Sequence, residues 1–159
     1  MKRLLTLAIL LATPASARDT LGVFEDWGAF RDAKPRRCYA IAEPERRSTR
    51  RAWRPFASVA HWPARGARNQ LHIRLSREKA EGAKVTLGIG SRSFELVAGG
   101  ADAWAADPRA DAAIVAAMRS GSQMSIRTRA KGGGFFTDSY RLRGAATAID
   151  AAAVGCARR

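Results

Sequence analysis

The sequence has few of the residues that define several protein classes. Its 159 residues include two cysteines, two histidines, six prolines and 14 glycines. This composition excludes collagen-like and mucin-like chains, and no sustained heptad pattern indicates a long coiled coil. Acidic residues are also scarce, since 14 Asp and Glu stand against 28 Lys and Arg and give a formal net charge of +14. With 47% hydrophobic residues the chain is long enough to bury one core, so we expect a small, basic, globular protein.

Long apolar runs are absent too. About 20 apolar residues are needed to span a bilayer, and the run at residues 4–12 has roughly half that length. It follows two cationic residues and precedes small residues that end at Ala17, an arrangement typical of a cleaved secretory signal peptide. We therefore predict that residues 1–17 are removed and that residues 18–159 form a single domain, located in the periplasm or secreted. Cleavage would remove two cations and no acid, leaving a net charge of 26 − 14 = +12.

The two cysteines become interpretable if the protein is exported. In an oxidising compartment an even number of cysteines usually indicates a disulfide, and Cys38 with Cys156 is the single intramolecular pairing available. A catalytic thiol or a shared metal site is the alternative. Neither cysteine lies in a C-x-x-C spacing, and both lie in segments patterned like ordinary structural elements. We predict a structural disulfide that joins the two ends of the mature chain.

Apolar residues alternate with a period of two in several segments, which predicts short strands that are buried on one face. We predict strands at residues 22–30, 37–43, 70–76, 84–90, 93–97, 123–129 and 135–142. The segments 70–76 and 84–90 are expected to pair with each other in antiparallel fashion. Tight or glycine-rich turns are expected at residues 91–92 and 131–134. The expected fold class is mostly β, an antiparallel β-sandwich or half-barrel with one or two short helices.

Two segments have helical rather than alternating periodicity. Residues 108–119 carry apolar side chains on one stripe, with Asp107 as a possible N-cap and a glycine just beyond the end. Residues 145–157 form an alanine-rich run of high helix propensity. This C-terminal helix would carry Cys156 on its buried face, docked against the strand that contains Cys38.

The order of several segments along the chain is distinctive. They are VFEDWGAF at 23–30, RCYAIA at 37–42, LHIRLS at 71–76, DAAIVAAM at 111–118 and YRLRG at 140–144. In this order they resemble the invasion-associated locus B family of small exported bacterial envelope proteins, over most of residues 22–156. The resemblance implies a β-rich exported protein whose biochemical activity is poorly defined. The family often has a further cysteine after the central strands, whereas the loop at 97–104 contains none.

Arginine supplies 23 of the 28 basic residues and is concentrated between residues 36 and 68, where two acids oppose it. The candidate anion-binding residues are Arg46, Arg47, Arg50, Arg51, Trp53, Arg54, Trp62, Arg65 and Arg68. Arginine donates paired hydrogen bonds to phosphate and carboxylate and stacks on planar rings. The expected partner is an anionic envelope polymer, a lipid headgroup or an envelope protein, bound more weakly as salt rises. The alternatives are that residues 46–54 form a solvated loop and that the tryptophans pack in the core.

Signatures of catalysis and of nucleic-acid recognition are missing from the sequence. His61 and His72 lie outside any zinc-binding motif, no G-x-S-x-G is present, and no RNA- or DNA-binding motif accompanies the charge. Helix capping accounts more simply for Asp107 and Asp111 than an acidic site does, and the environment of Asp138 stays open. We therefore predict a non-enzymatic, monomeric binding protein without cofactor, metal or nucleic-acid partner. The alternative is a secreted hydrolase or hydrolase inhibitor with an unrecognised site.

Overall fold

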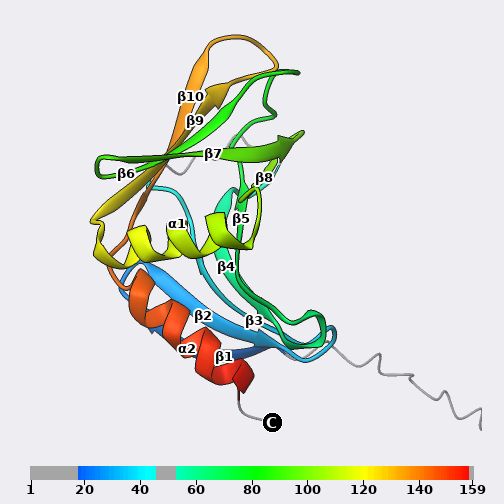
Figure 1. Ribbon diagram of the computed structural model, residues 1–159, viewed down its shortest axis with the longest axis vertical. Coiled ribbons are helices and arrows are strands. Elements are labelled where there is room, and N and C mark those ends of the chain that lie inside the picture. The colour runs from blue at the N-terminus through cyan, green and yellow to red at the C-terminus, as the bar shows by residue number, and fades with distance from the viewer. Residues whose placement is uncertain (1–17, 46–52, 158–159) are drawn as a thin grey trace, which may run out of the picture.

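The computed structural model of the protein describes residues 18–45 and 53–157 (Figure 1). Four residues of the predicted anion-binding set, Arg46, Arg47, Arg50 and Arg51, lie outside these ranges, as does the predicted leader. The described residues form a mostly β fold with two α-helices, which confirms the predicted fold class. No helix in this part of the chain is long and apolar enough to cross a bilayer.

Strands are the main elements of the described part of the chain. They are β1 (Arg18–Phe24), β2 (Trp27–Asp32), β3 (Arg37–Ala42), β4 (Phe56–Trp62), β5 (Ala67–Arg74), β6 (Val85–Ile89), β7 (Arg92–Gly99), β8 (Asp102–Trp104), β9 (Gln123–Arg129) and β10 (Phe135–Arg141). A 3-10 turn, η1 (Pro63–Arg65), joins β4 to β5. The helices are α1 (Pro108–Ser120) and α2 (Ala145–Ala157).

The described strands form one open antiparallel sheet in the order β1-β2-β3-β4-β5-β8-β7-β6-β9-β10. The sheet curls, so that the C-terminal end of β10 contacts β2 and the segment that follows β3. The Trp27 indole N–H donates to the carbonyl oxygen of Arg141 at 2.8 Å, and the Glu45 N–H donates to that of Ser139 at 2.8 Å. The two halves of one sheet therefore enclose a core between them, as the layers of a sandwich do.

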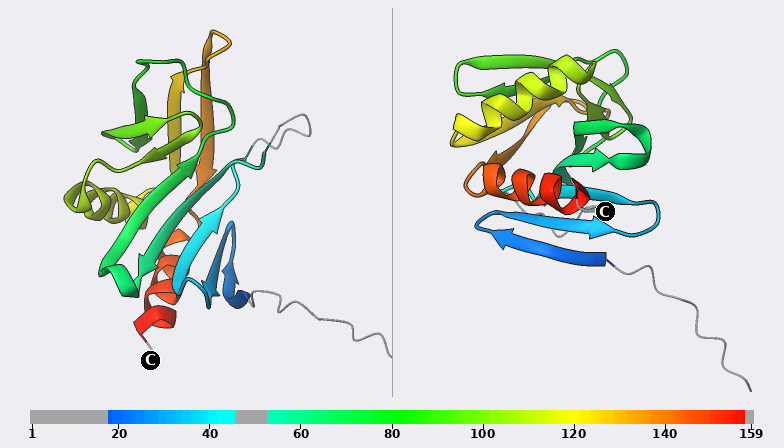
Figure 2. Two further views of the ribbon diagram at one scale, coloured as in Figure 1. Left: turned by 90° about the vertical axis from the view of Figure 1, so that its right-hand side faces the viewer. Right: turned by 60° about the horizontal axis from the view of Figure 1, so that its bottom comes forward.

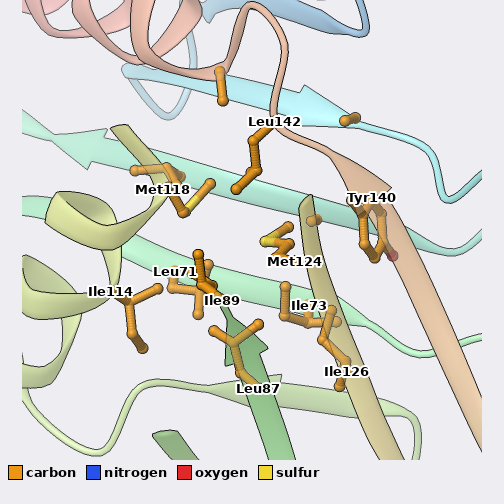
Figure 3. Packing of buried hydrophobic residues seen from close by; sticks show 14 of the residues in the cluster. Leu71, Ile73, Leu87, Ile89, Ile114, Met118, Met124, Ile126, Tyr140 and Leu142 are labelled. Carbon is orange, nitrogen blue, oxygen red and sulfur yellow. The ribbon is translucent and has the colours of Figure 1, made fainter. Parts of the chain in front are cut away.

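The core lies on the inner face of the curled sheet (Figure 3). The alternation of β5, β6 and β9 points their aliphatic side chains inward, where they meet one stripe of α1. The fully or almost fully buried residues at the centre are Leu71, Ile73, Leu87, Ile89, Ile114, Met118, Met124, Ile126 and Tyr140. Both helices pack on this same inner face, so they leave the outer face of the sheet uncovered (Figure 2).

Each helix is fixed at one end by a local feature of the sequence. The Asp107 carboxylate accepts from the Ala110 N–H at 2.8 Å and caps α1, as predicted. Helix α2 spans the predicted residues 145–157 and packs on β1 to β4. Its Cys156 forms the predicted disulfide with Cys38 on β3, with the Cα atoms 5.6 Å apart. Gly144, before α2, has φ 82°, and a Cβ there would overlap the Phe24 carbonyl oxygen.

Three predictions about the strands are wrong in detail. β5 pairs with β4 and β8, and β6 with β7 and β9, so the predicted pairing of 70–76 with 84–90 does not form. The predicted strand at 22–30 is divided by a turn at Glu25, whose φ is 52°. β4 and β8 were not predicted. β4 is nearly buried on both faces and lacks alternation, whereas β8 has three residues and is too short to show a period.

Candidate binding surface

The structure separates the predicted anion-binding residues that it describes into two groups. Trp53 and Arg54 precede β4, and Trp62 ends β4 and is followed by Arg65 in η1, whereas Arg68 in β5 belongs to neither group. The two groups therefore lie at opposite ends of one strand. The described residues of the predicted anion-binding set therefore do not form one continuous patch.

Around Trp62 the outer face of the sheet carries stacked arginines and aromatic rings. The guanidinium carbon of Arg65 lies 5.0 Å from the Trp62 ring centroid, and that of Arg37 lies 5.3 Å from it. Arg37 is also 4.7 Å from the Tyr39 ring, and Arg18 is 5.8 Å from the same ring. We call this set the arginine–aromatic ladder; it consists of Arg18, Phe30, Arg37, Tyr39, Trp62 and Arg65.

Strand register explains why these side chains share one face. Phe30 lies opposite Tyr39, and Tyr39 lies opposite Ala60, so that the three residues project from the same side of β2, β3 and β4. Trp62 follows Ala60 by two positions and points the same way. Ala60 leaves room between the larger rings. Tyr39 is only 5% exposed although no helix covers it, because neighbouring side chains of the ladder surround it.

One carboxylate lies within the ladder. Asp32 pairs with Arg18 at 3.2 Å and with Arg37 at 2.8 Å. Burial opposes ionisation of Asp32, but the hydrogen bonds and charges of Arg37 and Arg18 outweigh it and lower the pKa of that carboxyl. Burial, and then the Asp32 charge, raises the pKa of the Tyr39 hydroxyl, which stays neutral. Arg65 has no carboxylate partner among the described residues, so the ladder carries 3 − 1 = +2 charges.

The group at the other end of β4 is arranged differently. The Trp53 indole N–H donates to the Leu75 carbonyl oxygen at 2.7 Å, and Arg74 stacks on the Trp53 ring. Arg54 forms an ion pair with Glu43. The Trp53 ring is thus held by a backbone hydrogen bond and by Arg74, and the charge of Arg54 is partly neutralised.

Arg68 lies apart from both groups. It lines a cleft of about 440 Å³ together with Trp104 and Asp111. Asp111 was predicted to be a capping residue, but its carboxylate accepts from the Leu71 N–H of β5 at 2.8 Å. Burial is the main cause that raises the pKa of Asp111. This carboxylate ties α1 to the sheet.

The two histidines occupy opposite faces of the sheet. His72 Nε2 lies 2.9 Å from Asp102 Oδ1, and the imidazole stacks on Trp104 with centroids 5.3 Å apart. Ser58 faces His72 across the strands, but its hydroxyl donates to the His72 carbonyl oxygen at 3.4 Å, not to the ring. A serine nucleophile would need its hydroxyl on the imidazole, so this trio lacks the arrangement of a hydrolase.

Two buried polar groups lie away from the outer face. His61 is 7% exposed on the inner side of β4, where its Nδ1 accepts from the Asn69 N–H at 3.5 Å. Asp138, whose environment the sequence left open, is 3% exposed and accepts from the Ser76 N–H at 2.7 Å. Within residues 18–45 and 53–157, no three His, Cys, Asp or Glu side chains are arranged to hold a metal ion.

Four of the six ladder residues were missed from the sequence. Trp62 and Arg65 were among the candidates, whereas Arg18, Phe30, Arg37 and Tyr39 were not singled out as site residues. The available signal was the alternation of Arg37 and Tyr39 in one predicted strand, which places both on one face. Joining them to Trp62 requires the pairing of β3 with β4, and β4 itself was not predicted.

Comparisons with known proteins identify a similar fold. No protein-family model and no curated protein sequence matches the chain. Among solved structures, the chain is similar to the crystal structure of invasion associated protein B from Bartonella henselae, with a TM-score of 0.64 and 15% sequence identity. The similarity covers 87% of this chain and 99% of the other. The chain thus has an invasion associated protein B-like fold.

Proposed function

We propose that the protein is an exported, monomeric and non-enzymatic binding protein whose arginine–aromatic ladder binds an anionic component of the bacterial envelope. The observation that carries the proposal is the ladder itself. Arg18, Arg37 and Arg65 lie along three aromatic rings on the uncovered face of the sheet, and one carboxylate opposes them. A polymer with phosphate or carboxylate groups at intervals is complementary to such a row of cations.

The stacking of the guanidiniums supports binding by preorganisation. An arginine side chain that is free in solution loses rotamer freedom when it binds, at a cost of about 0.5–1.5 kcal/mol. Arg37 already lies between the rings of Tyr39 and Trp62 and contacts Asp32, so less of that freedom remains to be lost. A stacked guanidinium still has N–H groups along its edge for an incoming anion.

Several further features support export. The disulfide between Cys38 and Cys156 suits an oxidising compartment, and the N-terminal segment has the pattern of a cleaved leader of residues 1–17. The invasion associated protein B-like fold agrees with an envelope location. We propose that residues 18–159 function as one domain in the periplasm.

A salt titration on immobilised heparin and on lipopolysaccharide tests the proposal. The double variant Arg37→Gln/Arg65→Gln should bind about tenfold more weakly at low salt, because two charge-assisted contacts are lost. The control Arg92→Gln/Arg109→Gln removes the same charge from β7 and α1, outside the ladder. Equal weakening in both variants would show that net charge alone is bound, and the ladder would have no binding role.

The same titration separates binding from the alternative of a hydrolase. Anion binding should weaken steadily between low and physiological salt, because the interaction is screened over about 10 Å at 0.1 M. A hydrolytic reaction would depend on pH more than on ionic strength. Turnover of the bound polymer, measured as released product, would overturn the non-enzymatic proposal.

A further inference from the structure

The other half of the sheet carries a hollow that the ladder does not include. The residues that line it come mostly from β6, β9 and β10. These strands lie at the end of the molecule away from β1 and β2 (Figure 1). The volume of the hollow is about 580 Å³, within the range of small-molecule sites. The residues that line it are Ala83, Lys84, Thr86, Gly88, Ser125, Arg127, Thr128, Arg129 and Phe135.

Small outward-facing residues create the hollow. Gly88 lies directly opposite Ser125 in the pairing of β6 with β9, and Thr86 lies opposite Arg127. Their inward neighbours are large core residues, so alternation places only a hydrogen atom and a short hydroxyl side chain at the floor. The floor therefore has a hydroxyl group for hydrogen bonding and no bulky side chain.

One wall of the hollow carries two cations beside an exposed ring. Phe135 is 65% exposed, and the guanidinium carbons of Arg127 and Arg129 lie 4.9 Å and 6.0 Å from its ring centroid. Neither arginine pairs with a carboxylate among the described residues. On the other rim, Lys84 is already paired with Glu95 at 3.0 Å. The unneutralised charge is thus concentrated on the side of Phe135.

We propose that this hollow is a second binding site, which takes an acidic saccharide unit. The two guanidiniums suit a carboxylate or phosphate group on the sugar, since paired N–H donors match either anion. The Ser125 hydroxyl on the floor suits the hydroxyls of the sugar, and the exposed aromatic ring of Phe135 suits its apolar C–H face. The site is independent of the ladder, because the two share no residue and lie on different strands.

Chemical-shift titration of the labelled protein tests the site directly. The probes are trigalacturonate and glucose 6-phosphate, with maltotriose as the neutral control. Trigalacturonate or glucose 6-phosphate should shift the amide signals of Gly88 and Ser125, whereas maltotriose should not. A response to one acidic probe alone identifies whether carboxylate or phosphate is recognised. No shift with either acidic probe, or equal shifts with maltotriose, would overturn the proposal.

Two variants locate the binding determinants. Arg127→Gln/Arg129→Gln should weaken binding of the active probe at least tenfold. Gly88→Val keeps every charge but fills the floor. A Cβ at Gly88 would lie 3.5 Å from Ser125 Oγ, an ordinary contact, and valine is favoured in strands. This variant should also abolish the shifts. Unchanged affinity in Gly88→Val, with circular dichroism of the wild type, would show that the hollow is not the site.

The ladder variant provides the matched control. Arg37→Gln/Arg65→Gln should bind the active saccharide with wild-type affinity, even where its retention on heparin is lost. The two measurements therefore test the saccharide site and the ladder independently, and one proposal can be refuted while the other stands. Binding of inorganic phosphate as tight as that of glucose 6-phosphate would reduce the site to simple anion binding and refute recognition of the sugar.

Discussion

His61 is a buried histidine whose surroundings disfavour the protonated imidazole. Burial is the largest cause that lowers its pKa, with a contribution from the Arg68 charge, and a backbone contact of Ile149 opposes them. The folded protein therefore holds the imidazole neutral at a pH where the unfolded chain protonates it. Between the folded pKa and the ordinary value near 6.5, the unfolded state binds more protons, so stability rises with pH.

We expect the free energy of unfolding to fall as pH is lowered from 7 to 5, with a slope from His61 of at most about 1.4 kcal/mol per pH unit. Urea denaturation at several pH values measures this slope. His61→Gln should reduce it, and His72→Gln, on the outer face, controls for the loss of an imidazole. A slope that is the same in His61→Gln as in the wild type would contradict this account of the residue.

Asp138 shows the cost of a single buried acceptor. Its carboxylate satisfies the Ser76 N–H and links β10 to the end of β5. We predict that Asp138→Ala destabilises the protein by about 1–3 kcal/mol, because a buried N–H is left without a partner. Asp138→Asn retains an acceptor oxygen and should cost less. Thermal and chemical denaturation measure the stability of the two variants. Equal stability of Asp138→Ala and Asp138→Asn would contradict a role for this hydrogen bond.

At the scale of elements, the junction between β10 and α2 is the most constrained connection. Gly144 combines a positive φ with close approach to the Phe24 backbone, so it fixes where α2 begins relative to the end of β1. The helix then lies along the inner face of β1 to β4 (Figure 2). A side chain at this position would shift the helix away from the strands that it covers.

A matched pair of glycine variants measures that constraint. Gly82 also has a positive φ, 67°, but no atom lies within 4 Å of a Cβ built there. Gly82→Ala should therefore cost about 1 kcal/mol, which reflects backbone conformation alone. Gly144→Ala adds the overlap with Phe24 and should cost at least about 2 kcal/mol more. Equal destabilisation, measured by urea denaturation, would mean that the junction relaxes without strain.

Local sequence patterns predicted where the strands and helices lie better than they predicted which strands pair with each other. Alternation identified β3, β5, β6, β7, β9 and β10. Helical spacing identified both helices, helped by the Asp107 cap for α1 and by the alanine-rich composition for α2. Pairing partners depend on long-range packing, which a local period does not contain. The ladder illustrates the consequence, because Trp62 meets Arg37 only through the pairing of β4 with β3. The hollow likewise depends on the pairing of Gly88 with Ser125, which are distant from each other in the sequence.

At the scale of the whole molecule, one disulfide bond links segments that are distant in the sequence. Cys38 and Cys156 are separated by 118 positions, and their disulfide attaches the last helix to the third strand. The large core between the two halves of the sheet contains no cysteine. The small cluster around the disulfide consists of Cys38, Cys156 and Ala152 with Leu21 packed against it.

We predict that Cys38→Ser/Cys156→Ser lowers the free energy of unfolding by about 2–5 kcal/mol, because a long loop in the unfolded chain is no longer closed. Hydrogen exchange should show loss of protection that is largest in α2 and β1. The wild type measured in reducing agent is the matched comparison. Mass spectrometry that found free thiols in the purified wild type would contradict the bond itself.

The order of the elements also constrains when the molecule can finish folding. Helix α2 follows all of the described strands along the chain, yet it covers the inner face of the first four. A polypeptide that emerges from a ribosome or a translocation channel, N-terminus first, therefore exposes that apolar face until residue 157 has been released. The interval before release is when a chaperone would have a binding surface, and the arrival of the final helix removes it.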